Sequence, residues 1–401
     1  MVKKCRKKIP LSAAAVQTFF DFSPNIPTFA ASITAMEQEG TYNSALKVNE
    51  GITAPDSLNP QAVERMKALK SAVLPAQNYI DGILRGDIVM LSKAITLIES
   101  SLPGHQLVAQ EVIAGCLPQS GNAVRLGITG VPGAGKSTFI EALGVMLADN
   151  NHKVAVLAID PSSQRSKGSI LGDKTRMEQL ATHPNAYIRP SASAGTLGGV
   201  ARKTRESIIL CEAAGFDTII VETVGVGQSE TAVHAMVDFF LLILISGAGD
   251  ELQGIKRGIM EMADGIVVNK ADGDNILKAN RAKAECENAL HLFPMAESGL
   301  PPKVLTCSSI EKTGIPETWD MVMHFINETR GNGYLQQKRN SQAVRIMHDS
   351  IEDDILRHFY ENPAVQKDLT GIENAIREQR ISSYIGAGML IEAYFRTLTN
   401  K

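Results

Sequence analysis

A glycine-rich octet that follows a strand-like run constrains this chain more than any other feature. The octet fits G-x-x-x-x-G-K-[ST] and reads Gly130-Val131-Pro132-Gly133-Ala134-Gly135-Lys136-Ser137. Residues 124–129 before the octet are typical of a buried strand. The residues after it, from Thr138 to Ala148, are typical of a helix. Glycines let successive backbone N–H groups turn toward one anion, and the helix N-terminus adds partial positive charge. The octet therefore predicts a triphosphate-binding loop in which Lys136 reaches the β- and γ-phosphates and Ser137 holds Mg²⁺.

Composition narrows the class of protein. Of the 401 residues, 44% are hydrophobic and 21% are charged, which suits a packed core. A net charge of −3 gives no electrostatic footprint for nucleic acid or an anionic membrane. The longest apolar run, 239–246, is strand-sized, whereas a membrane span needs roughly 18–20 residues. The cysteines are scattered without a C-x-x-C pair, which argues against a zinc site or a disulfide framework and favours a reducing compartment.

The beginning of the chain has a different composition. Lysine and arginine cluster at positions 3–8, and Asp21 is the sole acidic residue before Glu37. Such a stretch is typical of a transit peptide, of a disordered tail, or of translation started upstream of Met36, and we favour the last two. Residues 1–70 as a whole are polar with weak periodicity, so we expect a flexible or extended leader.

Strand-like and helical segments alternate between residues 123 and 332. Nearly continuous apolar runs occur at 124–129, 153–159, 217–222, 239–245, 265–268 and 303–307. Strands without polar alternation are typical of a parallel sheet that is covered on both faces. We therefore predict an α/β domain, a doubly wound and mainly parallel sheet, with its functional residues at the carboxyl ends of the strands.

Helical segments flank this domain on both sides. In residues 71–122 the apolar positions have helical spacing, with Asp87 at an N-cap position and Pro103-Gly104 between the last two of the segments 76–85, 88–100 and 106–116. Helical spacing returns in residues 333–401, at 336–360 and 371–398, which Asn362-Pro363 joins. We expect the first set to pack on the nucleotide-binding domain. The second is interpreted as a dimerisation element, although such helices can also pack on their own domain.

The base that the site reads is indicated by an N-K-x-D motif just after the run 265–268. A carboxylate at Asp272 can accept hydrogen bonds from N1–H and from the 2-amino group of guanine, and adenine offers neither donor there. Lys270 would lay its aliphatic stem along the base, and Asn269 would brace the loops. Further base contacts are predicted from the loop after 303–307, namely backbone N–H groups of Ser308-Ser309 to the guanine oxygen, with Ile310 beside them.

Carboxylates at two further strand ends predict the metal and water-positioning groups. Glu222 ends the run 217–222, and the N–H of Gly225 beyond it can bond a γ-phosphate while that phosphate is present. Asp160 ends the run 153–159, and Asp173 follows in the segment 160–176. Carboxylates can hold Mg²⁺ or orient the attacking water. We assign Ser137, Glu222 and Asp173 to the metal and Asp160 to its outer sphere or to the water; the two aspartates could exchange roles.

A third segment, 247–256, follows the most apolar run. Its glycines permit movement, and Lys256 could supply positive charge to the transition state of phosphoryl transfer. The predicted catalytic set is therefore Lys136, Asp160, Glu222 and Lys256. The small and glycine-rich stretch 189–201 is interpreted as a loop that faces a partner or a substrate.

As an ordered set, these motifs resemble those of the MeaB/ArgK/MMAA GTPases, in the SIMIBI class of P-loop proteins. The resemblance covers roughly residues 76–400 and rests on D-P-S-S at 160–163, G-S-I-L-G-D-K-T-R-M at 168–177, E-T-V-G-V-G-Q-S-E at 222–230, G-D-E-L-Q-G-I-K at 249–256 and N-K-A-D at 269–272. It implies that Lys136 and Ser137 bind phosphate and Mg²⁺, that Asp173 and Glu222 serve the metal, and that Asp272 reads guanine. The segment 247–256 matches the family's third switch, with Lys256 as a candidate catalytic cation.

The resemblance also implies a biological role. Members act as chaperones for adenosylcobalamin-dependent methylmalonyl-CoA mutase, so we expect that mutase or a related acyl-CoA mutase as the partner. The implied GTPase is slow alone and stimulated by the partner, and its nucleotide state gates cobalamin loading and protects or reactivates the mutase. The expected ligands are GTP or GDP with Mg²⁺, and cobalamin is met through the partner alone. The resemblance implies a homodimer through the C-terminal helices. The implied compartment is a bacterial cytoplasm or, if the leader is a transit peptide, a mitochondrial matrix.

Two other functions remain open from the sequence. A small-molecule kinase, once proposed for such sequences as an amino-acid transport kinase, would need an acceptor pocket and a base aimed at the acceptor, and no motif marks either. A metal-insertion GTPase would need a His/Cys cluster, and the histidines show no ligand spacing.

Overall fold

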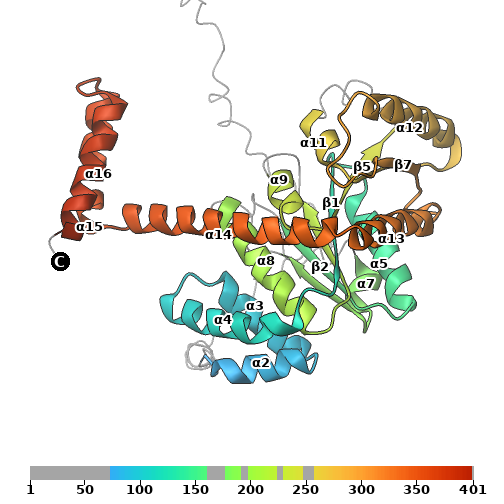
Figure 1. The fold of residues 1–401 in the computed structure, drawn as a ribbon, viewed down its shortest axis with the longest axis horizontal. Helices are drawn as coiled ribbons and strands as arrows, with labels where there is room; N and C mark the ends of the chain where they lie inside the picture. Colours follow the sequence, from blue (N-terminus) through green and yellow to red (C-terminus); the bar gives the residue numbers. More distant parts are fainter. Residues whose placement is uncertain (1–72, 160–176, 191–196, 224–228, 247–256, 400–401) are drawn as a thin grey trace, which may run out of the picture. The chain divides into compact units, whose positions relative to one another are not determined.

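A parallel β-sheet with helices on both faces forms the centre of the structure (Figure 1). The computed structural model describes residues 73–159, 177–190, 197–223, 229–246 and 257–399, all within one unit that spans residues 72–401. The sheet has seven strands in the order β3-β2-β4-β1-β5-β6-β7, and every neighbouring pair is parallel. The strands are β1 (Val124–Gly130), β2 (Val154–Ile159), β3 (Ala186–Pro190), β4 (Thr218–Thr223), β5 (Phe239–Ile245), β6 (Gly265–Asn269) and β7 (Lys303–Thr306). The predicted doubly wound parallel sheet is confirmed.

One strand was missing from the sequence prediction. β3 pairs with β2 at the edge of the sheet, from Val154↔Ala186 to Ala158↔Pro190. It has five residues and ends in Pro190, which cannot donate a ladder hydrogen bond and is tolerated in edge strands. A short edge strand that ends in proline lacks the apolar run by which the other strands were predicted.

Helices that alternate with the strands, together with α13 after the last strand, bury both faces of the sheet. They are α5 (Lys136–Asp149), α7 (Glu178–Thr182), α8 (Leu197–Ala213), α9 (Ser229–His234), α11 (Arg257–Met262), α12 (Ile276–Leu290) and α13 (Ile315–Gly331), with short 3-10 turns η1 (Leu117–Gln119) and η2 (Gly273–Asn275). Successive strand residues point to opposite faces. On β4, Ile219 and Val221 join the core beneath α8, whereas Ile220 joins the core beneath α5 and α13. Both faces are therefore apolar, and each such buried side chain contributes about 1.5–3 kcal/mol to stability.

The N-terminal helices pack on the nucleotide-binding domain, as the sequence predicted, and they cover the face of the sheet that carries α8. They are α2 (Ala76–Leu84), α3 (Ile88–Glu99) and α4 (Pro103–Cys116), and their buried side chains share one core with β2, β4 and α8. Asp87 caps α3, because its carboxylate accepts the N–H groups of Val89 (2.8 Å) and Met90 (3.2 Å), a contact worth about 1 kcal/mol. The predicted start of α4 at residue 106 was wrong. Pro103 opens the helix instead, since proline needs no hydrogen-bond donor in a first turn.

The C-terminal helices are α14 (Tyr334–Tyr360), α15 (Pro363–Arg377) and α16 (Ser383–Thr399) (Figure 1). The predicted continuous helix over 371–398 was wrong, because the chain turns at residues 378–382 between α15 and α16. Asn362 accepts the N–H of Ala364 at 2.9 Å and caps α15. The α15–α16 hairpin has a small core of its own, formed around Val365, Ile372 and Leu390. Among the residues described, no helix combines the length and apolarity that crossing a bilayer requires.

Candidate nucleotide site

The phosphate-binding octet leaves the carboxyl end of β1, which lies between β4 and β5. Two of its glycines are required by their surroundings. A Cβ on Gly130 would collide with the carbonyl oxygen of Ile243 on β5, so the loop can pass over that strand with glycine alone. Gly135 has a φ of +85°, and a Cβ there would lie 2.7 Å from the side-chain nitrogen of Asn269. The loop is therefore held tightly between β5 and the end of β6.

Lys136 folds back over its own loop. Its ammonium donates to the carbonyl oxygens of Gly130 at 2.9 Å and Val131 at 3.4 Å, and the residue is 9% exposed. Burial lowers the pKa of Lys136, and the carboxylates of Glu222 and Glu230 offset part of that shift. A phosphate would compete well for this cation, because bonds between two charged groups are roughly twice as strong as neutral ones.

A serine–carboxylate pair lies beside the octet. The hydroxyl of Ser137 donates to Glu222 Oε1 at 3.0 Å, and Glu222 is 4% exposed near the end of β4. The next residue, Thr223, shares a 3.0 Å hydroxyl contact with Thr129 and so joins the ends of β4 and β1. Oxygen ligands of this kind are those that Mg²⁺ prefers, so Ser137 and Glu222 fit a magnesium site at the mouth of the loop.

On the other side of the octet, Asn269 links three segments. Its side-chain nitrogen donates to the carbonyl of Ala134 at 2.8 Å, which ties β6 to the phosphate loop. Its Oδ1 accepts from the thiol of Cys307 (3.3 Å), and from the N–H (3.2 Å) and hydroxyl (2.9 Å) of Ser309 after β7. Burial raises the pKa of Cys307 to about 12, so the thiol keeps the proton that it donates. Asn269 thereby fixes the spacing between the phosphate side and the base side of the site.

Asp272 and Ser308, which the sequence predicts to face the base, form a hydrogen-bonded pair that we call the base side of the site. The Ser308 hydroxyl donates to Asp272 Oδ2 at 2.6 Å and accepts the N–H of Glu311 at 3.1 Å, so it sets the orientation of the carboxylate. Lys270 is exposed and left-handed, with a φ of +61°. The backbone amides of this loop differ from the sequence expectation. Ser308 N–H donates to Thr313 O at 3.0 Å and Ser309 N–H to Asn269, so neither points to a base in this arrangement.

The remaining predicted residues divide into two groups. Pro132 and Gly133 are exposed at the tip of the octet, Thr138 is exposed in the first turn of α5, and Ile310 is exposed beside the base side. Four others lie outside the described residues, as do the segments that contain them: Asp160, Asp173, Gly225 and Lys256.

Sequence reasoning gave no role to two residues that the structure brings to the site. Glu230, in the first turn of α9, is 1% exposed and its charge acts on Lys136. Cys307 orients Asn269 through its thiol. Each stands at the edge of a motif, Glu230 at the end of 222–230 and Cys307 just before Ser308, and that position was the signal available.

Comparisons with known proteins agree with this geometry. Residues 91–364 match the family described as "Methylmalonyl Co-A mutase-associated GTPase MeaB". The chain is 46% identical over 308 residues to "GTPase ArgK" of Escherichia coli, covering 77% of this chain and 93% of that relative. It is 43% identical over 332 residues to "Methylmalonic aciduria type A homolog, mitochondrial" of Mus musculus, covering 79% and 80%.

A solved structure supports the same assignment. The "Crystal structure of LAO/AO transport system kinase" superposes with a TM-score of 0.64 at 38% identity, covering 80% of this chain and 99% of that one. The family match spans more than half of the chain, and the relatives are matched over most of their length. This chain therefore belongs to the MeaB family of P-loop GTPases.

Proposed function

We propose that this GTPase is a chaperone for an adenosylcobalamin-dependent acyl-CoA mutase, with methylmalonyl-CoA mutase as the first candidate. The observation that carries the GTP part is the arrangement around Asn269, which holds a phosphate loop and an Asp272–Ser308 pair at a fixed spacing. The mutase part is supported by the family description, which names a mutase association. The proposed compartment is the cytoplasm, with the mitochondrial matrix as the alternative that the mouse relative's name supports.

The proposed roles follow the positions of the residues. The octet and Thr138 would surround the phosphates, Lys136 would pair with the β- and γ-oxygens, and Asp272 would accept the guanine donors. Ser137 and Glu222 would hold Mg²⁺, together with Asp173, while Asp160 would position the water or exchange roles with Asp173. When bound, Mg²⁺ neutralises charge that develops on the phosphates. Gly225 would bond the γ-phosphate, Lys256 would supply positive charge to the transition state, and Ile310 would lie beside the base.

The partner would act on the hydrolysis step. We propose slow hydrolysis by the chain alone, because its switch segments would be ordered by the mutase, and cobalamin would be met through that partner. Adding purified methylmalonyl-CoA mutase is expected to raise the rate of GTP hydrolysis about tenfold or more, measured as phosphate release. Lys136→Ala is the control for contaminating phosphatases. Equal rates with and without saturating mutase, from a chain that binds GTP, would count against this partner.

A kinase is the second candidate, since the solved relative carries that word in its title. A kinase would pass the γ-phosphate to an acceptor rather than to water. Two cavities among the described residues, of 440 Å³ at α4, α8 and α14 and of 740 Å³ beside α12 and β7, lie away from the octet. Labelled GTP distinguishes the two functions, because label in an amino acid or protein would indicate a kinase.

Metal insertion is the third function that the sequence left open. The described residues hold no group of three or more His, Cys, Asp or Glu placed around one metal position.

We also propose a homodimer through the C-terminal helices. On α16, Tyr384, Gly388, Ile391, Phe395 and Leu398 follow a 4-3-4-3 spacing, the pattern by which helices pack against each other. Tyr384 is 92% and Phe395 57% exposed, and apolar residues of α14 such as Met347 and Ile351 are about half exposed. Contiguous apolar faces of this kind are uncommon on monomers, so a second copy is the proposed cover.

The proposed dimer contact on α16 predicts that charged side chains placed there will separate the two copies. Replacing Ile391 and Phe395 together by Glu would place two charges on each side of the proposed contact, where they would be desolvated and repel. The variant is expected to run at the monomer mass in size exclusion with light scattering, while the unchanged chain runs as a dimer. Lys367→Glu, an exposed polar position on α15, is the matched control and should stay dimeric. A double variant that keeps the dimer mass would place the contact elsewhere.

A further inference from the structure

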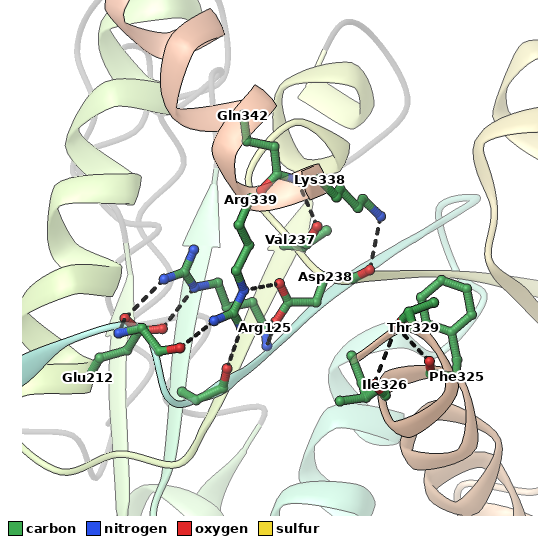
Figure 2. A network of polar contacts seen from close by, with 12 residues as sticks. Arg125, Glu212, Val237, Asp238, Phe325, Ile326, Thr329, Lys338, Arg339 and Gln342 are labelled. Atoms are coloured by element: carbon green, nitrogen blue, oxygen red, sulfur yellow. Dashed lines mark hydrogen bonds and ion pairs between the residues drawn. The ribbon is translucent and has the colours of Figure 1, made fainter. Parts of the chain in front are cut away.

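The first turns of α14 rest on the short turn between α9 and β5. The side-chain amide of Gln342 donates to the carbonyl oxygen of His234 at 3.4 Å, at the carboxyl end of α9, and to that of Val237 at 2.9 Å, in the turn that follows. Figure 2 shows the contact with Val237. Lys338 donates to the carbonyl of Asp238 at 2.9 Å. The root of the proposed dimerisation element is therefore in direct contact with the helix that follows residues 224–228.

Arg339 and Lys338 hold α14 to the strands. The Arg339 guanidinium pairs with the buried Asp238 carboxylate at 2.5 and 2.7 Å and also donates to the carbonyls of Gly121 and Ala123 just before β1. Lys338 lies 3.4 Å from Asp264, just before β6. Because these partners adjoin the amino ends of strands in a continuous ladder, they form a fixed base.

Gln342 differs from these anchors because one of its donated bonds goes to His234, the last residue of α9, and the other to Val237 in the turn that follows. It is 7% exposed, and its Oε1 has no hydrogen-bond partner among the described residues, so among those residues the amide is oriented by the carbonyls of His234 and Val237. Helix α9 and the turn after it pack tightly on β1. A Cβ on Gly127 of β1 would lie 2.9 Å from side-chain carbons of Val233 and of Val237. In so close a contact, a displacement of α9 must move its neighbours.

The amino end of α9 follows Thr223 by six residues along the chain, and Thr223 contacts Thr129 just before the octet. Glu230 is buried in its first turn, and its negative charge acts on Lys136. A triphosphate would bring further negative charge to that lysine, so it would compete with Glu230 for the same cation. A helix of six residues is about 9 Å long, so one end can lie near the phosphate loop while the other meets α14.

We propose that α9 couples occupancy of the phosphate site to α14, with Glu230 and Gln342 as the positioning residues at its two ends. The inference rests on the proposed nucleotide binding. A triphosphate would shift α9 through Glu230, and Gln342 would pass that shift to α14 while Arg339 and Lys338 hold the helix base. The C-terminal helices, which are proposed to bind a second copy, would then differ between the GTP and GDP states.

Hydrogen exchange tests the coupling on the full chain. With a non-hydrolysable GTP analogue in place of GDP, we expect altered exchange in both 229–234 and 334–345. In Gln342→Met the change in 229–234 should remain and that in 334–345 should be lost. Gln337→Met, an exposed glutamine on the same helix, is the matched control and should behave as the unchanged chain. The same nucleotide response of α14 in Gln342→Met as in the control, or none in the unchanged chain, would overturn the proposal.

Linkage supplies a second readout that does not require a structural change to be seen. If α14 and the phosphate site are coupled, loosening one must alter the other, and coupling factors of about 5-fold or more are typical. Gln342→Met and Glu230→Gln should each change the ratio of GTP-analogue to GDP affinity by about that factor, and their double variant by less than the product. Unchanged ratios would refute the coupling. Because both affinities are measured directly, a chain that binds no guanine nucleotide would be recognised as a failure of the proposed function itself.

Discussion

Asp272→Asn is expected to convert a guanine site into one that prefers xanthine. The Asp272 carboxylate is an acceptor at both oxygens, and Ser308 holds it in place through a 2.6 Å bond to Oδ2. An amide would place an N–H₂ group opposite the N1–H and 2-amino donors of guanine, whereas xanthine offers a carbonyl at that position. Sites built on such hydrogen bonds discriminate by about 10⁴-fold or more, so GDP affinity should fall by several orders of magnitude. Titration with GDP and with xanthosine diphosphate measures both changes.

Ser308→Ala is the comparison that separates two roles: binding the base, which is assigned to the Asp272 carboxylate, and orienting that carboxylate, which is assigned to Ser308. It removes one hydrogen bond to a charged group, worth about 1.5–3 kcal/mol, and leaves the carboxylate in place. GDP binding should therefore weaken by about one to two orders of magnitude without any gain for xanthine. If Asp272→Asn kept its guanine preference, Asp272 would not be the group that reads the base.

The central strands could be predicted because their environment is simple. β5, at residues 239–245, is apolar at every position since both of its faces are covered, and the run ends where the cover ends. β3 could not be found in this way, because Pro190 and its short length remove that pattern. The two-helix hairpin after α14 was missed for a related reason. Residues 378–382 contain neither glycine nor proline, so no helix-breaking residue marks the turn, in which Gln379 has a left-handed φ of +56°.

The motifs predicted the residues of the candidate nucleotide site, but they did not predict the contacts among those residues. Asn269 contacts Cys307 because of the register of β6 against β7. It contacts Ala134 because the phosphate loop passes close to the end of β6. The predicted use of the Ser308 and Ser309 amides overlooked that loop's own turn, in which Thr313 takes up the first of them. Contacts such as Arg339 with Asp238, which lie far apart in the chain, leave no local pattern at all.

Arg339→Met is expected to be among the most destabilising single changes in the described residues. Asp238 has a fully buried side chain, and its carboxylate is shared by Arg339 and the N–H of Arg125. Burial lowers the pKa of Arg339, but pairing with Asp238 outweighs that effect and raises it, so the guanidinium is charged. Removing the cation would strand a buried anion, which costs about 3–5 kcal/mol, a large part of the 5–15 kcal/mol by which domains are typically stable. The midpoint of urea unfolding measures the loss.

Arg205→Met is expected to have the opposite sign, although Arg205 belongs to the same group of charges. Its Nη1 is buried and has no hydrogen-bond partner among the described residues. Burial, and then repulsion from Arg125, lower its pKa to about 10, with Arg339 adding to the effect. At pH 7 the guanidinium is still charged, so the unfavourable burial is present throughout the neutral range. An apolar side chain of similar length removes that charge and strands no anion, since Glu212 keeps the paired Arg125. The free energy of unfolding should therefore stay the same or rise by up to about 4 kcal/mol, and a loss equal to that of Arg339→Met would mean that Arg205 supports the network rather than opposing it.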